Sequence, residues 1–239
     1  MKSRQEIKAI GKAEFKANYW NCVLALLLVG AVLCLLNGAS YTKNVKDIVE
    51  GNVLQTAYES GTSISVKLGG LLYLLLSGPL DIGLNYFFVK NVQRRRDGLT
   101  ATTPFVQAFQ NYPRKLGGSL WMSLFIFLWS LLFVIPGIIK AFSYSMTPYI
   151  LADCPDVKAQ DALKLSMRMM KGHKGEYFVL ILSFIGWGIL TVLTAGLVGV
   201  FYAGPYLQST LAAYYLEVRE QALRTGAVRA EQLAGVMPA

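Results

Sequence analysis

Long apolar stretches recur along this chain and restrict its fold more than any other feature. Six of them alternate with polar segments, at about residues 19–36, 68–89, 116–135, 138–152, 177–195 and 200–216. A helix needs roughly 20 apolar residues to cross a bilayer, where each backbone polar group must be bonded within the protein. The sequence therefore predicts an all-α polytopic membrane protein with six transmembrane helices.

The composition agrees with a membrane protein. Of the 239 residues, 54% are hydrophobic and 15% are charged, whereas soluble domains carry about 25% charged residues. We expect an amphipathic helix over 1–18, one membrane domain over 19–216 and a polar tail over 217–239. The stretch 138–152 is short for a span, so it either begins inside the membrane or is a broken helix buried among the others.

The basic residues predict the orientation. Lys and Arg total 23. Nineteen of them fall in the N-terminal segment, the loops after spans two and four, and the tail, whereas only Lys43, Lys46, Lys67 and Lys140 fall on the other side. Cytoplasmic loops carry the excess of Lys and Arg. The prediction is a multi-pass protein of the cytoplasmic (cell) membrane with both termini in the cytoplasm. The net charge of +9 is then a property of that face and not a sign of nucleic-acid binding.

Three amphipathic helices are expected on the cytoplasmic surface. The first begins with a capping box at Ser3 and Glu6 and carries a basic stripe at Arg4, Lys8, Lys12 and Lys16. Such a helix is typical of contact with an anionic membrane surface, with the lysines at the phosphates and the apolar side, which includes Ile7, in the membrane. The alternative is a solvated lead-in that only orients the first span. The second follows Thr103 as N-cap and Pro104, and the third follows Asp156 as N-cap.

The third surface helix leads into the fifth span through a basic hinge. Gly172, His173, Lys174 and Gly175 form this hinge, which we expect to set the helix at an angle to the span. We expect Leu at both glycines to disturb folding more than His173→Ala. The helix carries Met167 and Met170 on one face, and this face either packs on the protein or lipid or docks a partner.

A polar group is predicted within the membrane at Asp81. Asn85 follows one turn later on the same side, and Tyr144 and Gln208 are the other candidate partners. These four residues form either a structural polar cluster or a proton- or ion-coupled site. Helix kinks are expected at Pro79, Pro148 and Pro205.

Catalytic and cofactor motifs are missing from the sequence. It has no P-loop and no GxSxG motif, and its one histidine excludes a site with several histidine ligands. Cys22, Cys34 and Cys154 have no spacing that suggests disulfides or a metal, so we assign them to packing. We predict no enzyme activity, no metal and no cofactor.

The central part of the chain resembles a known family. The residues that carry the resemblance are Tyr144-Ser145-Met146, Pro148-Tyr149, Asp156, 162–166, 170–174, Phe178 and 183–187, together with 4–13 at the start. They resemble the domain-of-unknown-function 975 family of bacterial, mostly Firmicutes, integral membrane proteins. The resemblance implies a location and a fold, and it transfers no catalytic residue.

The functional hypothesis is an integral membrane protein without catalysis. It would act through lipid or protein contacts on its cytoplasmic face, as a scaffold, a membrane-homeostasis factor or an accessory subunit. Its partners would be anionic lipid headgroups, with another membrane protein or a second copy as further partners. The alternative hypothesis is a small transporter or channel with a kinked-helix cavity near Asp81.

Overall fold

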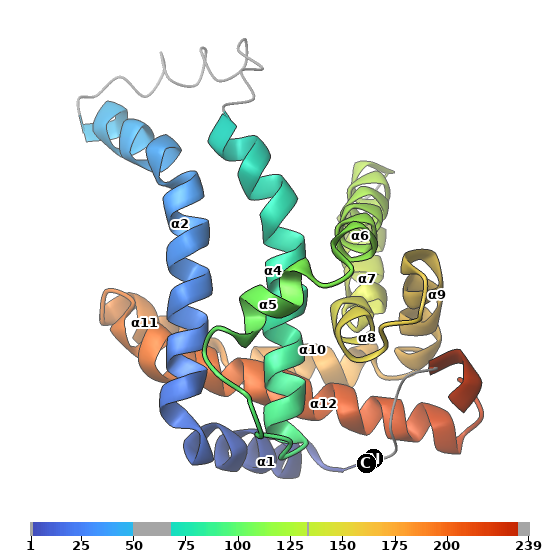
Figure 1. Ribbon diagram of the computed structural model, residues 1–239. Coiled ribbons are helices and arrows are strands. Elements are labelled where there is room, and N and C mark those ends of the chain that lie inside the picture. The colour runs from blue at the N-terminus through green and yellow to red at the C-terminus, as the bar shows by residue number, and fades with distance from the viewer. Residues whose placement is uncertain (1, 50–67, 133, 234–239) are drawn as a thin grey trace.

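The protein is a set of helices in a computed structural model that describes residues 2–49, 68–132 and 134–233 (Figure 1). Within these ranges every regular element is helical. The side chains of residues 37–69 and 132–134, among them Lys43, Lys46 and Lys67, lie outside the description. The α-helices are α1 (Arg4–Ala17), α2 (Tyr19–Val49), α4 (Leu68–Val92), α5 (Thr103–Phe109), α6 (Tyr112–Leu132), α7 (Val134–Tyr144), α8 (Thr147–Asp153), α9 (Ala159–Met169), α10 (Lys174–Leu182), α11 (Ile185–Leu193) and α12 (Gly204–Arg224). A π-helical turn, η1 (Gly199–Ala203), precedes α12, and a 3-10 turn, η2 (Ala230–Leu233), follows it.

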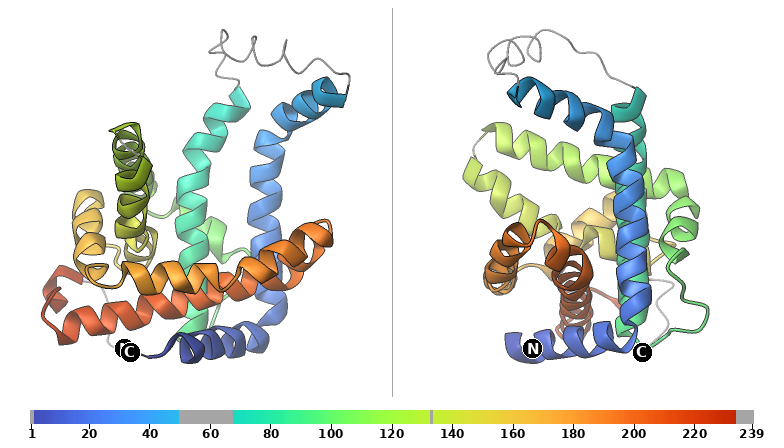
Figure 2. Two further views of the ribbon diagram at one scale, coloured as in Figure 1. Left: turned by 180° about the vertical axis from the view of Figure 1, so that it is seen from behind. Right: turned by 90° about the vertical axis from the view of Figure 1, so that its left-hand side faces the viewer.

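The helices form pairs that run in different directions. Figure 1 shows α2 and α4 side by side, with α12 crossing them and α1 lying along the lower edge. In the quarter-turned view of Figure 2, α6 and α7 run across α2. The long helices therefore do not share one axis, in contrast to a simple up-and-down bundle.

Three helical stretches are long and apolar enough to cross a membrane. They are Tyr19–Leu36, Gly70–Val92 and Lys174–Leu193 among the residues that the structure describes. The first continues as regular helix to Val49, well past the predicted end at 36. The third is divided between α10 and α11, because the backbone leaves the α-helical pattern at Ser183 and Phe184.

The predicted span 138–152 is a broken helix, which is one of the two expected possibilities. α7 ends at Tyr144 and α8 begins at Thr147. The Ser166 hydroxyl, on α9, accepts a hydrogen bond from the Met146 amide (3.2 Å) and donates one to the Ser143 carbonyl (2.8 Å). One side chain thus bonds two backbone groups at the break.

The N-terminal helix packs on the protein and is not held by lipid alone. The capping box of Ser3 and Glu6 is confirmed. Ile7 and Phe15 are buried, and α1 crosses α12 so closely that a Cβ at Gly11 would lie 2.7 Å from the Thr210 Cα atom. The apolar side that the sequence assigned to the membrane therefore faces α12.

Two predicted N-caps are wrong. Thr103 is the first residue of α5 and not its cap, because its hydroxyl oxygen accepts a hydrogen bond from the Thr100 amide and so caps the preceding turn. Asp156 lies before α9, whose cap is Lys158 in extended conformation. The turn between α8 and α9 therefore runs from Cys154 to Lys158, two residues past the predicted N-cap.

Candidate functional site

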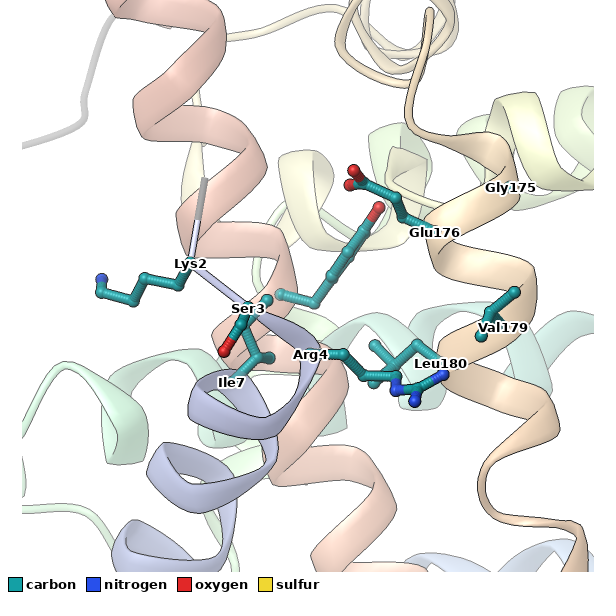
Figure 3. Close-up of a pocket in the computed structure, with 9 residues that line it drawn as sticks. Lys2, Ser3, Arg4, Ile7, Gly175, Glu176, Val179 and Leu180 are labelled. Carbon is teal, nitrogen blue, oxygen red and sulfur yellow. The ribbon is translucent and has the colours of Figure 1, made fainter.

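A groove lies where α1, α10 and α12 meet. It has a volume of about 510 Å³ and is lined by Lys2, Ser3, Arg4, Ile7, Gly175, Glu176, Val179, Leu180 and Tyr214. Figure 3 shows Arg4 reaching from α1 toward Leu180, while the Glu176 carboxylate lies at the other end of the groove. Its size falls within the range of small-ligand sites.

Aromatic contacts hold the walls of the groove. Ring pairs join α10 and α11 to η1 and α12: Tyr177–Tyr214 (5.4 Å), Phe184–Tyr206 (5.0 Å) and Trp187–Tyr202 (4.9 Å). The Tyr214 hydroxyl also donates to the His173 carbonyl (3.0 Å), which fixes the start of α10 against α12. All three ring pairs are tilted, an arrangement that stabilises aromatic contacts beyond the area they bury.

The charged groups of the groove differ in their partners. Lys2 Nζ pairs with Glu217 Oε2 at 2.8 Å, and this hydrogen bond raises the pKa of Lys2. Glu176 Oε2 lies 3.3 Å from His173 Nδ1. Within the part of the chain that the structure describes, the Arg4 guanidinium makes no hydrogen bond or ion pair. Arg4 is therefore the cation that remains available to a ligand.

The next residue of the basic stripe is committed to the protein. Lys8 Nζ donates to the Ser183 hydroxyl (3.2 Å) and lies 4.5 Å from the centre of the Phe184 ring. Burial lowers the pKa of Lys8. The stripe thus contacts the break between α10 and α11, while Lys12 and Lys16 stay exposed.

The predicted hinge residues divide into two kinds. Gly172 has φ +89° and lies between α9 and α10, so it makes the turn. Gly175 lies inside the first turn of α10 and needs no special backbone conformation. His173 caps α10, Lys174 begins it, and both are half-buried.

The apolar face of α9 is covered by the protein itself. Ala162, Leu163, Leu165 and Met169 are buried, as is Met170 just after the helix. Met167 is only partly buried. Met169 and Met170 therefore belong to the packed interior, Met167 lies at its edge, and the protein itself covers the apolar face of this helix.

The predicted intramembrane polar group lies beside a second, smaller cavity. Asn85 Nδ2 donates to Asp81 Oδ2 at 3.2 Å. The cavity next to Asp81 has a volume of about 210 Å³ and lies between α4, α6 and α8. Its other polar lining residues are Ser77, Ser119, Ser123 and Thr147. Sequence reasoning missed these hydroxyls, although Ser119 and Ser123 are one helical turn apart and thus share a face.

Tyr144 and Gln208 lie apart from the Asp81 cavity. Neither lines it, and within the described residues neither has a hydrogen bond to Asp81. The Tyr144 ring contacts Phe125 and lies 6.0 Å from Lys140 Nζ, which also lies over Trp129. The structure thus brings together only Asp81 and Asn85 of the four predicted residues.

The three prolines act differently. Pro79 lies inside α4, where it removes the hydrogen bond to the Leu75 carbonyl, and the Tyr112 hydroxyl donates to that carbonyl instead (3.1 Å). Pro148 lies in the first turn of α8, after the break that follows Tyr144, where a missing amide hydrogen costs little. Pro205 lies in the first turn of α12, which continues directly from the π-helical turn η1.

Two buried carboxylates on the basic side were not predicted as sites. Asp153 binds Arg219, accepts from the Tyr215 hydroxyl (3.3 Å) and lies 3.8 Å from Lys90 Nζ. Glu14 binds Arg94 (2.9 Å) and Arg96. Both acids are paired with structural cations, so they join helices and are not exposed to a substrate. In the described part of the chain, no group of acidic, His or Cys residues could hold a metal ion.

These features define an all-helical protein in which three described helical stretches could cross a membrane. Residues 131–222 match the model of a family described as Protein of unknown function (DUF975), and this match supports membership of that family. The matched segment contains the α7–α8 break, Ser166, the Gly172 turn and most of α12. No curated protein and no solved structure matches the chain.

Proposed function

We propose that this chain is an integral protein of the cytoplasmic membrane that acts without catalysis, by binding lipid headgroups on its cytoplasmic face. The single observation that carries the proposal is the groove of Figure 3, where the unpaired cation Arg4 stands beside apolar side chains of a candidate span. A site of this kind can hold a phosphate and an acyl chain together. The exposed Lys12 and Lys16 add attraction for anionic lipids.

Six crossings with both termini in the cytoplasm are part of the proposal. The distribution of Lys and Arg along the sequence supports the location of the termini. Six crossings require the α6–α7 and α10–α12 pairs to cross the same bilayer as α2 and α4. In Figures 1 and 2 these pairs run in other directions than α2 and α4. If only α2 and α4 cross the bilayer and the other pairs lie at the interface, both termini still lie on the same side of the membrane.

Reporter fusions distinguish these topologies. We expect reporters fused after Gly51, Gly137 and Gly196 to be external, and reporters at the tail to be cytoplasmic. An external reporter at Gly51 alone would replace six crossings by two. A cytoplasmic reporter at Gly51 would overturn the orientation altogether.

Lipid analysis tests the binding function. The full chain would be extracted with its surrounding bilayer in polymer-bounded discs, and the lipids in the discs would be compared with those of the bulk membrane. We expect enrichment of anionic phospholipids and its reduction in the double variant Lys12→Gln with Lys16→Gln. The matched control Arg229→Gln also removes a cytoplasmic-side charge, but from an exposed residue far along the chain. Unchanged lipid composition in all discs would overturn lipid binding.

Transport is a second candidate function because of the Asp81 cavity. A carboxylate and several hydroxyl groups line a space of about 210 Å³ beside the kinked helix α4. Intramembrane carboxylates are often part of ion or proton pathways. Ion or proton flux into proteoliposomes would support this function if Asp81→Asn abolishes it, and equal flux with and without the protein would exclude it.

A further inference from the structure

The charges that line the groove of Figure 3 are of opposite sign and lie at its two ends. Arg4 lies on the α1 side near Leu180, and Glu176 projects from the first turn of α10 at the far end. The third charged lining residue, Lys2, is neutralised by Glu217 at 2.8 Å. The groove is thus bipolar and has no net charge of its own.

Both end groups retain unused bonding capacity. The Arg4 guanidinium is exposed and, in the ranges described, has no hydrogen-bond partner. Among the described residues, Glu176 contacts only His173, through Oε2, and its side chain is 57% exposed, so Oε1 is open to a donor. A guanidinium binds phosphate oxygens in a planar fork, and a carboxylate accepts hydrogen bonds from a primary ammonium.

The floor between the two ends is apolar and open. Ile7 and Leu180 form the buried part of this floor, and Val179 is 40% exposed. Gly175 adds no side chain, and nothing lies within 4 Å of the place where its Cβ would stand. An occupant can therefore lie across the groove without displacing a side chain at this position.

Beyond Val179, further exposed apolar side chains follow along α10 and α11. Phe178, Leu182, Ile185 and Ile189 are between 47% and 59% exposed. These residues belong to the candidate span Lys174–Leu193, which begins beside the groove. An acyl chain can follow this surface away from the charged ends, as expected for a lipid and not for a soluble metabolite.

We propose that the groove binds the headgroup of an aminophospholipid, with its phosphate against Arg4 and its primary ammonium against Glu176. This inference rests on the proposed function, because it requires the start of α10 to lie at headgroup depth. A zwitterionic headgroup matches a bipolar groove at both ends. A purely anionic headgroup would bring a negative charge near Glu176, and a quaternary ammonium would offer that carboxylate no N–H donor.

The test compares three phospholipids with the same acyl chains. Full-length protein in detergent would be titrated with phosphatidylethanolamine, phosphatidylcholine and phosphatidylglycerol, and bound lipid would be counted by native mass spectrometry. We expect phosphatidylethanolamine to bind about tenfold more tightly than either other lipid, which corresponds to one charge-assisted hydrogen bond. This comparison needs no variant, so it does not depend on how any substitution folds.

Two variants test which groove residue binds each end of the headgroup. Glu176→Gln should reduce the affinity for phosphatidylethanolamine to that for phosphatidylcholine, with no loss for phosphatidylglycerol. Arg4→Gln should weaken binding of all three lipids, because each has a phosphate. The matched controls are Glu231→Gln and Arg229→Gln, which lie outside the groove and should leave every affinity unchanged.

The outcomes separate this inference from the proposed function. Equal binding of the three lipids, or a preference for phosphatidylglycerol that Glu176→Gln leaves unaltered, would overturn the aminophospholipid site and leave lipid binding in place. Absence of any bound lipid would overturn both. A preference for phosphatidylethanolamine that survives Glu176→Gln would also contradict the inference, because the ammonium would then lie elsewhere.

Discussion

Gly11 is the residue that sets how closely α1 approaches α12. A Cβ at this position would lie 2.7 Å from the Thr210 Cα atom and 2.8 Å from its amide nitrogen, and backbone atoms cannot move aside as a flexible side chain can. We predict that Gly11→Ala destabilises the protein by about 1–3 kcal/mol, despite the better helix propensity of alanine. Thermal unfolding in detergent would measure this loss.

Gly30 provides the matched control for Gly11. It also lies in a helix, but nothing stands within 4 Å of its would-be Cβ. Gly30→Ala should leave the stability unchanged or raise it by up to about 1 kcal/mol. If both variants unfold at the wild-type temperature, α1 is not packed on α12 as the structure has it.

The sequence predicted the start of α1 but not the surface on which it packs. Its capping box depends on Ser3 and Glu6 alone, so local pattern is sufficient. The pattern also shows that Ile7 lies on an apolar face. It does not distinguish a membrane from a neighbouring helix as the partner of that face, because both are apolar. Only the tertiary structure shows that α12 covers it.

At the scale of elements, the turn between α9 and α10 depends on one glycine and not on two. Gly172 has φ +89°, which a side chain disfavours by about 1–2 kcal/mol, whereas Gly175 is helical with open space around it. We predict that Gly172→Ala lowers the unfolding temperature by several degrees and that Gly175→Ala leaves it equal or higher. Thermal unfolding of the two single variants in detergent is the measurement.

His173→Ala gives the comparison for this turn. The bond from Tyr214 is to the backbone carbonyl of residue 173 and survives the substitution, so only the contact with Glu176 is lost. That contact involves a side chain that is largely exposed, and the expected cost is below about 0.5 kcal/mol. A loss for His173→Ala that exceeds the loss for Gly172→Ala would indicate a role for the imidazole that the structure does not explain.

The breaks within the apolar stretches could be anticipated only in part. The short span 138–152 and its Pro148 indicated a discontinuity, and the structure has one between Tyr144 and Thr147. The hydroxyl that satisfies it comes from Ser166, twenty residues later, so no local signal could identify it. The same holds at the Pro79 kink, where the free carbonyl of Leu75 is bonded by Tyr112.

At the scale of the whole molecule, basic residues that indicate topology also hold the helices together. Arg94 and Arg96 bind Glu14 and thereby join α1 to the end of α4. Arg114 donates to the carbonyls of Leu151 and Val157 at 2.6 and 2.8 Å. Counting cations on each side cannot reveal such pairs, because the positive-inside rule considers number and not neighbours. The candidate site was hidden for the same reason, since only the tertiary structure places Arg4 in a groove with Glu176.

The Asp153 carboxylate shows most clearly how an ion pair joins helices. It lies on α8 and pairs with Lys90 on α4 and with Arg219 on α12. Its side chain is 2% exposed and that of Arg219 is 8% exposed. We predict that Arg219→Met destabilises the protein by about 3–5 kcal/mol, because it leaves a buried carboxylate with only a distant lysine and one hydroxyl. Chemical unfolding in detergent would measure the change, and Arg224→Met, which breaks an exposed pair with Glu220 on the same helix, should cost less than about 1 kcal/mol.

A double-mutant cycle separates the lost pair from the lost side-chain packing. If the cost of Arg219→Met is that of an uncompensated charge, adding Asp153→Asn should restore part of the stability, since the neutral amide needs no counter-ion. The coupling between the two substitutions should then exceed about 1 kcal/mol, in contrast to additive behaviour for Asp153→Asn with Arg224→Met. Additive losses of stability for Asp153→Asn and Arg219→Met would mean that packing alone holds α8 against α12. The rings of Tyr149 and Tyr215, which stack at 5.4 Å beside this ion pair, would then be the main contact.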